Sequence, residues 1–489
     1  MAAADTPEQR GGTRFPSPSA WPLPASAAWR TVRRVLEEQC FVLLALSLTV
    51  TAVVIAAPVS MVVPDTWLAL VDGRWIAQHG LPHADQLALW SHGVHWVDQQ
   101  WLGQPSFYGL ARLGGVKACV AVALALDAVA LAGAAFAARR LNASSASVAL
   151  GALIPIVVGP WLLQARTQSL ALPLFVGVYA LIAADARERS NKVYLAIPLL
   201  ALWANLHGSA SLGALVLALY GVLELGRKRL RGAVLALGAP VALLASPYGF
   251  DLIGYYRTML ILSPLRHYVQ EWEPTKLDSG TAPFFVLALL SLYLLGRRGA
   301  AVSLFERVAL PLFAVLGFLA ARNTIWLGLA CAVSLPTLID GVLGPSLELT
   351  RGMRRLNVVL SLVAVGLAGI VAAAMLSRPT SVLLGRWPAK GAAAVAAAAG
   401  PRGLVLADDV HSDWLLWEQP RLVGRIAYDV RFELLSPRRL AALQAFRNGR
   451  RPALAARFRV LTFANPADAA ALTRGRQATY RSAGFVAVH

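Results

Sequence analysis

The chain has 489 residues, of which 57% are hydrophobic and only 15% are charged, and its mean hydropathy is +0.58. This composition excludes a soluble multidomain protein and is typical of a polytopic membrane protein. The formal net charge of +19 does not indicate a nucleic-acid partner, because the basic residues gather in short loops between apolar runs. Three scattered cysteines offer neither a disulfide framework nor a metal-binding spacing.

From the N-terminus, residues 1–38 are predicted to form a disordered cytoplasmic tail, since residues 1–29 are rich in Pro, Ala and Ser. Residues 39–386 are predicted to form a transmembrane helix bundle. Its apolar runs suit single helical crossings of a bilayer core about 30 Å thick. We expect about eleven spans, at residues 40–60, 116–137, 146–163, 170–184, 193–206, 209–225, 232–246, 281–296, 308–321, 325–341 and 356–376.

Basic residues fall in alternate loops between these spans, which is the positive-inside pattern. The pattern predicts a multi-pass protein of the cell membrane with its N-terminus in the cytoplasm and its C-terminus outside. All the loops rich in other polar residues then face outward, among them a first outer loop at 61–115 and a second long one at 247–280. The basic loops are those of Arg30–Arg34, Arg139–Arg140, Arg187–Lys192, Arg227–Arg231, Arg297–Arg298 and Arg351–Arg355.

Residues 387–489 are polar and Arg-rich and contain no apolar run long enough to span. Short apolar strands are predicted at 404–407, 422–427, 460–463 and 485–488. They alternate with helices at 392–399, 413–417, 437–446 and 467–473. This alternation predicts a small extracytoplasmic α/β domain with a largely parallel sheet. The fold class is therefore mainly α, with a small C-terminal α/β domain.

The first outer loop concentrates acids and tryptophans beside the membrane, where ionisable groups are costly and usually functional. Residues 65–79 are predicted to form an amphipathic helix that places Asp65, Asp72 and His79 on one face by their seven-residue spacing. Residues 82–101 are predicted to be a structured loop. Asp65 can act as a general base or bind a divalent cation. It can equally be the N-cap of the helix, because Asp is a favoured N-cap residue.

Four histidines of this loop, His79, His83, His92 and His95, have spacings that zinc ligands can have. No cysteine joins them and they do not share a helix, so interfacial or hydrogen-bonding roles are the favoured alternative. Asp85, Trp96 and Asp98 are expected to order the loop or bind an acceptor.

Two arginines stand at hairpin tips on the outer side, Arg166 in LLQARTQS and Arg322 in LAARNTIW. Each can grip a lipid phosphate with paired donors, or reach the lipid headgroups as an ordinary interfacial arginine. His207 stands at another outer tip. The 247–280 loop adds Arg266, Glu271 and Glu273, which can complete an acceptor or cation site or belong to a plain interfacial turn.

The first outer loop opens with Asp65 and continues with Gly73-x-x-Ile76, His79-Gly-x-Pro82, Asp85 and a tryptophan-rich end. This order resembles the first outer loop of the GT-C membrane glycosyltransferases, which include protein mannosyltransferases, aminoarabinose transferases and oligosaccharyltransferase catalytic subunits. The resemblance covers this loop and, in layout only, the whole chain. It implies a polyprenyl-phosphate-linked sugar as donor and an aspartate of this loop, here Asp65, as the base.

The function predicted is transfer of a sugar from a polyprenyl-phosphate-linked donor to an extracytoplasmic glycan, lipid or protein, at a site beside the membrane lipid. Asp65 is the base, Arg322 and Arg166 bind the lipid phosphate, and a Mg or Mn ion, if one is used, binds Asp65 and Glu271. Expected substrate and acceptor contacts are Asp72, His79, Asp85, Trp96, Asp98, His207, Arg266, Glu271 and Glu273.

Two other functions stay open. One is a transporter or flippase of lipid-linked sugar or solute, for which Asp127, inside a predicted span, is the clearest acid. The other is a non-catalytic GT-C-like protein of cell-envelope assembly. Its outer domain would bind partners, with Arg421, Arg425 and Arg431 available for an acidic polymer.

Overall fold

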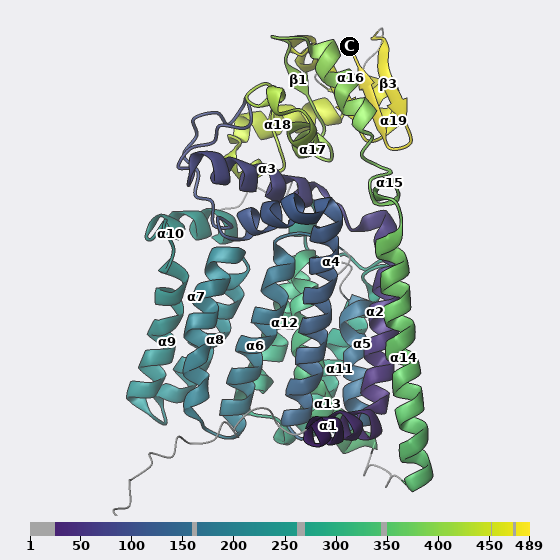
Figure 1. Cartoon of the computed structure of the whole chain (residues 1–489). Helices are drawn as coiled ribbons and strands as arrows, with labels where there is room; N and C mark the ends of the chain where they lie inside the picture. Colours follow the sequence, from purple (N-terminus) through teal and green to yellow (C-terminus); the bar gives the residue numbers. More distant parts are fainter. Residues whose placement is uncertain (1–24, 159–163, 262–268, 344–349, 451, 473–475) are drawn as a thin grey trace, which may run out of the picture.

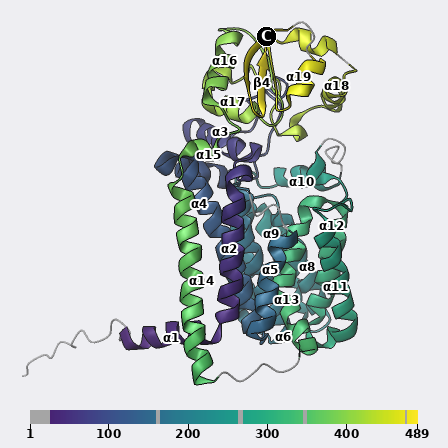
Figure 2. The same ribbon diagram turned by 90° about the vertical axis from the view of Figure 1, so that its right-hand side faces the viewer.

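The computed structural model describes residues 25–158, 164–261, 269–343, 350–450, 452–472 and 476–489. A bundle of roughly parallel and antiparallel helices carries a small sheet-containing domain at one end (Figure 1). Figure 2 shows the same two parts side-on, with helix α3 lying between them.

The helices of the bundle and of its outer loops follow one another closely along the chain. They are α1 (Ala25–Glu38), α2 (Cys40–Ser60), α3 (Pro64–His79), α4 (Gly103–Arg140), α5 (Ser145–Val158), α6 (Gln168–Arg187), α7 (Ala196–Leu206), α8 (Ala210–Leu225), α9 (Arg229–Leu244), α10 (Asp251–Tyr256), α11 (Ala282–Arg298), α12 (Leu304–Leu319), α13 (Thr324–Leu343), α14 (Arg351–Ser377) and α15 (Thr380–Leu383).

Each predicted span overlaps one of these helices, because an apolar run in a membrane must satisfy its backbone hydrogen bonds within itself. In the described part of the chain, α4, α6, α11, α13 and α14 are long and apolar enough to cross a membrane, and the count is six if α1 and α2 form one bent span. The fold is thus that of a multi-pass membrane protein. The number eleven and the orientation stay predictions.

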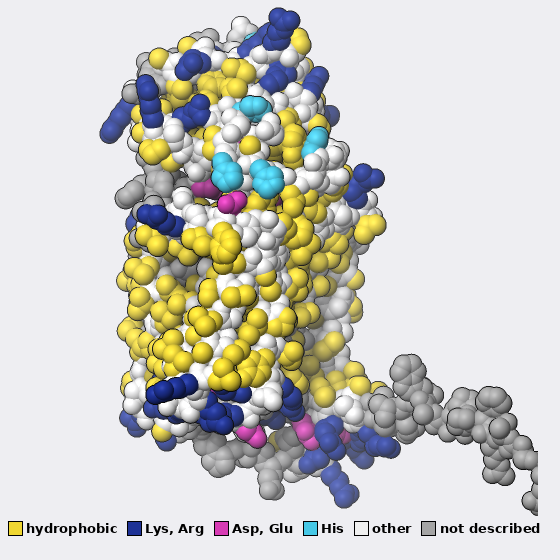
Figure 3. Space-filling model, turned by 90° about the vertical axis from the view of Figure 1, so that its left-hand side faces the viewer, with side chains coloured by type: hydrophobic (Ala, Val, Ile, Leu, Met, Phe, Trp, Pro, Cys, Tyr) yellow, Lys and Arg dark blue, Asp and Glu magenta, His cyan; other side chains and the backbone are white. Residues whose placement is uncertain are grey.

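The outer surface of the bundle is a broad apolar belt, and Lys and Arg crowd its end farthest from the C-terminal domain (Figure 3). Helix α14 shows why the belt is apolar. It packs mainly on α2 and α1, so that Val359, Val363 and Ile370 remain 57%, 51% and 65% exposed. Side chains of this kind suit contact with lipid tails.

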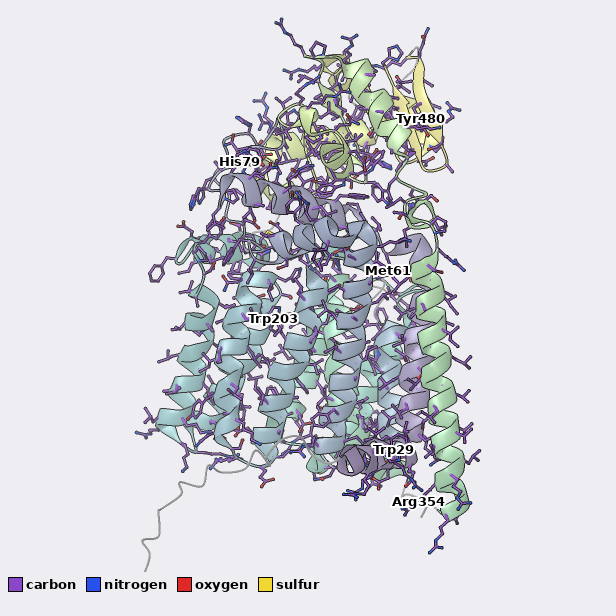
Figure 4. The ribbon with its side chains drawn as sticks, in the orientation of Figure 1. Trp29, Met61, His79, Trp203, Arg354 and Tyr480 are labelled. Carbon is purple, nitrogen blue, oxygen red and sulfur yellow. The ribbon has the colours of Figure 1, made fainter. Side chains whose placement is uncertain are left out.

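Helix α1 departs from the disorder expected over residues 1–38. Residues 25–38 are helical and the axis of this helix lies at 82° to that of α2. The sequence alternates basic residues with Trp29 and Val32, and Arg33 pairs with Glu37 one turn later at 2.8 Å, which stabilises a helix locally. Figure 4 places Trp29 at the same end of the bundle as Arg354. Residues 1–24 lie outside the described residues.

The predicted outer loop 61–115 contains α3 and the first three turns of α4. Gly114 and Gly115 break α4, with Gly115 at φ +67°, and the membrane part of the helix begins directly after this break. Helix α3 packs between α4 and the C-terminal domain. At Gly73 a Cβ would lie 2.3 Å from the carbonyl oxygen of Gln104, so this close approach requires glycine.

The C-terminal domain contains α16 (Ala389–Ala399), β1 (Val405–Leu406), α17 (Ser412–Glu418), α18 (Pro437–Arg447), β2 (Val460–Phe463), α19 (Pro466–Leu472), β3 (Ala478–Ser482) and β4 (Phe485–Val488). The predicted helices and three of the four predicted strands are confirmed. The strand order is β1-β2-β4-β3.

The expectation of a largely parallel sheet is wrong. Only β1 and β2 pair in parallel among the named strands, and both pairs that involve β4 are antiparallel. The strand β3 was not predicted, and a tight turn with Gly484 at φ +78° joins it to β4, which forces antiparallel pairing. The predicted strand 422–427 is reduced to a bridge, and Ile426 and Ala427 accept backbone hydrogen bonds from the first outer loop instead.

Candidate active site

A cavity of about 890 Å³ lies where the outer loops of the bundle meet the C-terminal domain. Loops far apart in the sequence meet here, because each follows or precedes a helix that ends at this face of the bundle (Figure 1). Six of the residues singled out in the sequence line the cavity together. They are Asp65, Arg166, His207, Glu271, Arg322 and Arg431.

Asp65 reaches the cavity from the first turn of α3. The N-cap of this helix is Val63, whose backbone N–H donates to the Thr66 hydroxyl at 3.0 Å, so the alternative that Asp65 is the N-cap is wrong. The same Thr66 hydroxyl donates to the carbonyl of Ala165 at 2.6 Å. This bond ties the start of α3 to the loop before α6 and brings Asp65 beside Arg166.

Arg166 is buried and its Nη1 lies 3.0 Å from Asp65 and 3.5 Å from Glu271. Burial would lower the pKa of this guanidinium, but the charges of Glu271 and Asp65 raise it above its ordinary value. The two carboxylates are 45% and 29% exposed, respectively, while the arginine is 4% exposed. Arg166 is therefore the buried ion-pair partner of the two acids, and the acids are the groups that a ligand in the cavity can reach.

Arg322 lines the cavity from the turn between α12 and α13, with its guanidinium 4.4 Å from the ring centroid of Trp272. Among the described residues no carboxylate lies within ion-pair distance of it. His207 follows α7, and its Nδ1 contacts the Ser209 hydroxyl at 2.7 Å. Burial, Arg322 and Arg166 hold the pKa of His207 well below its ordinary value, so this imidazole is neutral at physiological pH.

The cavity is apolar where it borders the bundle helices. Leu212 and Leu215 of α8 and Leu316 and Leu319 of α12 line it. Leu215 and Leu319 are 40% and 50% exposed, so unpacked apolar surface is available beside the charged groups. A ligand with a charged head and an apolar tail matches these two kinds of surface.

Several residues that were predicted to contact the substrate instead surround Arg431, in a second group of charged residues called the Arg431 cluster. The Arg431 guanidinium lies 2.7 Å from Asp85 and 3.7 Å from Asp72, contacts Asp429, and stacks 4.3 Å from the ring centroid of Trp96. Burial would lower the pKa of Arg431, but these carboxylates raise it well above its ordinary value. The cluster joins the first outer loop to the C-terminal domain.

The acids of this cluster differ from the prediction of substrate contacts. Asp72 and Asp85 are 1% and 0% exposed and line no part of the cavity. Asp98 is buried nearby, and burial raises its pKa to about 7. A surface role of Arg431 toward an acidic polymer is also wrong, because its side chain is 3% exposed and held by carboxylates. Arg425 likewise donates to the carbonyls of Gly400 and Gly403.

Two further predicted residues, His79 and Glu273, do not join the cavity. His79 stacks on Trp75 at 4.0 Å between ring centroids at the exposed end of α3 (Figure 4), and Glu273 pairs with Lys276 at 2.5 Å. Arg266 lies outside the described residues. The expectation that Asp65, Asp72 and His79 act together on one face is not met, since only Asp65 reaches the cavity.

A metal ion does not fit the donor set. Asp65 and Glu271 both face the same arginine nitrogen, and the described residues contain no group of three His, Cys, Asp or Glu that could hold a metal ion. This includes the four histidines of the first outer loop, of which His83 instead packs on Tyr248.

The cavity also contains residues that the sequence did not single out. Gln99, Gln100 and Gln104 contribute amides, and the C-terminal domain contributes Asp409 and Glu433. The sequence carries one weak signal for Glu433, the charged run Asp429-Val-Arg-Phe-Glu433 between two predicted elements. Nothing local shows that this run returns to the membrane face.

Comparison with solved structures defines the class of fold. The apo crystal structure of ArnT from Cupriavidus metallidurans is similar to this chain, with a TM-score of 0.51 and 14% identity over 95% of this chain and 98% of that chain. The protein has the GT-C fold, as the resemblance of its first outer loop predicted.

A second crystal structure of ArnT from Cupriavidus metallidurans, bound to undecaprenyl phosphate, is also similar. Its TM-score is 0.48, with 14% identity over 95% of this chain and 98% of that chain. No protein-family model matches the sequence, and no curated protein matches it significantly. At this identity the comparison shows the fold alone.

Proposed function

We propose that the protein is a membrane glycosyltransferase that moves a sugar from a polyprenyl-phosphate-linked donor to an acceptor outside the cytoplasm. The observation that carries the proposal is the cavity itself. It joins an exposed carboxylate, Asp65, and a cation that has no carboxylate partner among the described residues, Arg322, to exposed leucines of α8 and α12. The fold, which is similar to that of ArnT, an aminoarabinose transferase, supports it.

In this proposal the donor phosphate binds Arg322. A guanidinium offers paired donors to phosphate oxygens, and Trp272 holds this one in place by stacking. Arg166 is less suited to direct contact, because Asp65 and Glu271 already occupy its Nη1. The isoprenoid tail would lie along Leu215 and Leu319.

Asp65 is proposed to act on the acceptor. Its carboxylate takes the proton of an acceptor hydroxyl, whose oxygen forms a bond to the anomeric carbon. The bond between that carbon and the phosphate oxygen breaks, and the electron pair leaves with polyprenyl phosphate. The anomeric configuration is inverted. Arg166 keeps Asp65 oriented for this step.

Binding of undecaprenyl phosphate to the purified full-length protein in detergent tests the donor half. Arg322→Met is expected to weaken binding by about 10-fold to 100-fold, the range for losing a charged hydrogen bond. Arg112→Met, at an exposed arginine on the outer part of α4, is the matched control and should bind normally. A wild-type protein that does not bind this lipid would contradict the proposal.

Sugar transfer tests the other half, with radiolabelled undecaprenyl-phosphate-linked sugars added to membranes. Asp65→Asn is expected to lower transfer by about 100-fold or more and to leave lipid binding unchanged. His79→Gln, on the same helix but outside the cavity, should transfer normally. Movement of intact lipid-linked sugar across proteoliposomes, with no covalent transfer, would support the flippase alternative instead.

A further inference from the structure

The C-terminal domain contributes one wall of the cavity, and its segment 429–433 is held there by contacts with the first outer loop. Arg431 is bound to Asp72 and Asp85 of the first outer loop. Backbone hydrogen bonds from Leu89 to Ile426 and from Trp90 to Ala427 hold the residues just before it. Glu433 follows two residues after Arg431, in a 3-10 turn between the buried side chains of Phe432 and Leu434. Its carboxyl therefore has a defined place in the cavity wall.

Among the described residues, Glu433 differs from the other acids of the cavity in having no ion-pair partner. Asp65 and Glu271 face Arg166, and Asp409 lies 2.7 Å from Arg447. Among the described residues, no other side chain is hydrogen-bonded or ion-paired to the Glu433 carboxyl, and its own backbone N–H supports it. A carboxyl so placed is available to a ligand.

The surroundings of Glu433 also bring the pKa of its carboxyl close to neutral pH. Burial raises the pKa of Glu433 to about 7, Arg431 lowers it, and Asp429 and Asp65 raise it further. Its charge in turn acts on Asp98 in the outer loop and on Tyr255 of α10. Ionised Glu433 would repel a phosphate, so the anionic donor belongs at Arg322 and not at this wall.

We infer that Glu433 binds a hydroxyl of the acceptor, so that the C-terminal domain supplies the acceptor-recognising wall of the cavity. The inference rests on the proposed function. A carboxylate accepts strong hydrogen bonds from hydroxyl groups. It therefore favours an acceptor whose bound part is neutral and bears hydroxyl groups, such as a sugar ring, over one whose bound part bears a phosphate. Glu433 positions the acceptor, and Asp65 takes the proton of the acceptor hydroxyl.

The inference is tested in the full-length protein by steady-state transfer from an undecaprenyl-phosphate-linked sugar. The acceptor probe is a total lipid and glycan extract, titrated from membranes of cells that lack the protein. Glu433→Gln is expected to raise the apparent KM for the extract by about 10-fold to 100-fold. The kcat and the KM for the donor should change by less than about threefold.

Two variants keep the result interpretable. Glu433→Asp, which retains the charge, should recover part of the affinity, and Glu418→Gln, in the same domain but outside the cavity, should behave as wild type. Thermal unfolding midpoints of all variants should agree, which shows that the domain stays folded. A lower kcat with an unchanged acceptor KM, or kinetics like those of wild type, would overturn the assignment to Glu433.

A pH series gives an independent readout. Because ionised Glu433 is the form that binds the hydroxyl, the acceptor KM of wild type should fall as pH rises from 6 to 8. The dependence should vanish in Glu433→Gln, in which Asp98, Asp65, Tyr255, Asp429 and Arg431 are unchanged. A dependence that persists would contradict the inference.

These outcomes separate the two proposals. If wild type neither binds undecaprenyl phosphate nor transfers sugar, the proposed function is wrong. If wild type does both and Glu433→Gln does so with unaltered acceptor KM, only the role of Glu433 is wrong.

Discussion

Arg166 and Arg431 each sit buried among carboxylates at the junction of the bundle and the C-terminal domain, yet their partners differ in exposure. Asp65 and Glu271, beside Arg166, are 45% and 29% exposed. Asp72 and Asp85, beside Arg431, are both 0% exposed at the side chain. The same ion-pair chemistry therefore serves two purposes. Acids that reach a cavity can exchange an arginine contact for a ligand, and acids sealed from water can only hold two segments together.

The Arg431 cluster is expected to matter most for stability. In Arg431→Met, the carboxyl groups of Asp72, Asp85 and Asp429 stay buried but lose the cation that they contact. Removing one partner of a buried ion pair costs about 3–5 kcal/mol. The measurement is thermal unfolding in detergent, together with proteolysis of the C-terminal domain.

Arg421→Met is the matched control for that experiment, because Arg421 is an exposed arginine of the same domain. It should unfold as wild type does. If Arg431→Met were equally stable, the Arg431 cluster would not be the link between the domain and the first outer loop.

The group formed by Arg166, Asp65 and Glu271, called the Arg166 cluster, should matter more for activity than for stability. In Arg166→Met the exposed acids can be hydrated, so the expected loss of stability is about 1–2 kcal/mol. Transfer should fall by about 100-fold, because Asp65 loses the group that orients it. Unfolding and transfer are measured on the same preparation. A loss of stability as large as in Arg431→Met would remove the distinction between the clusters.

A gain of stability, and not a loss, is expected at Asp98, next to the Arg431 cluster. Burial raises its folded-state pKa to about 7, above an unfolded value near 3.9. The stability that the protonated form contributes is complete below about pH 4 and is lost as pH rises through about 7. Asp98→Asn should therefore stabilise the protein more at pH 8 than at pH 5, by about 2–3 kcal/mol.

Unfolding midpoints of Asp98→Asn and wild type at the two pH values measure this effect. The exposed Asp251→Asn should show no comparable difference. An equal effect of Asp98→Asn at both pH values would mean that Asp98 is ionised in the folded protein throughout this range.

Much of the architecture could be predicted because its causes are local. Apolar runs form helices in a membrane since no water is present to satisfy the backbone, and the predicted spans therefore match helices. The first outer loop was recognised from its own residues, and Asp65, Arg166, Glu271 and Arg322 were selected because each stands at a hairpin tip or loop on the predicted outer side. Their meeting in one cavity follows from that shared side.

What the sequence by itself determined is thus the helical bundle, the GT-C layout and the residues of the membrane-side wall. The tertiary structure alone decided which acids serve the cavity. Asp85 meets Arg431 across 346 positions of the chain, and this contact, together with the backbone hydrogen bonds from Leu89 and Trp90, holds the segment of Glu433 at the cavity. Contacts of this kind depend on how distant segments pack, and no local periodicity or spacing records them.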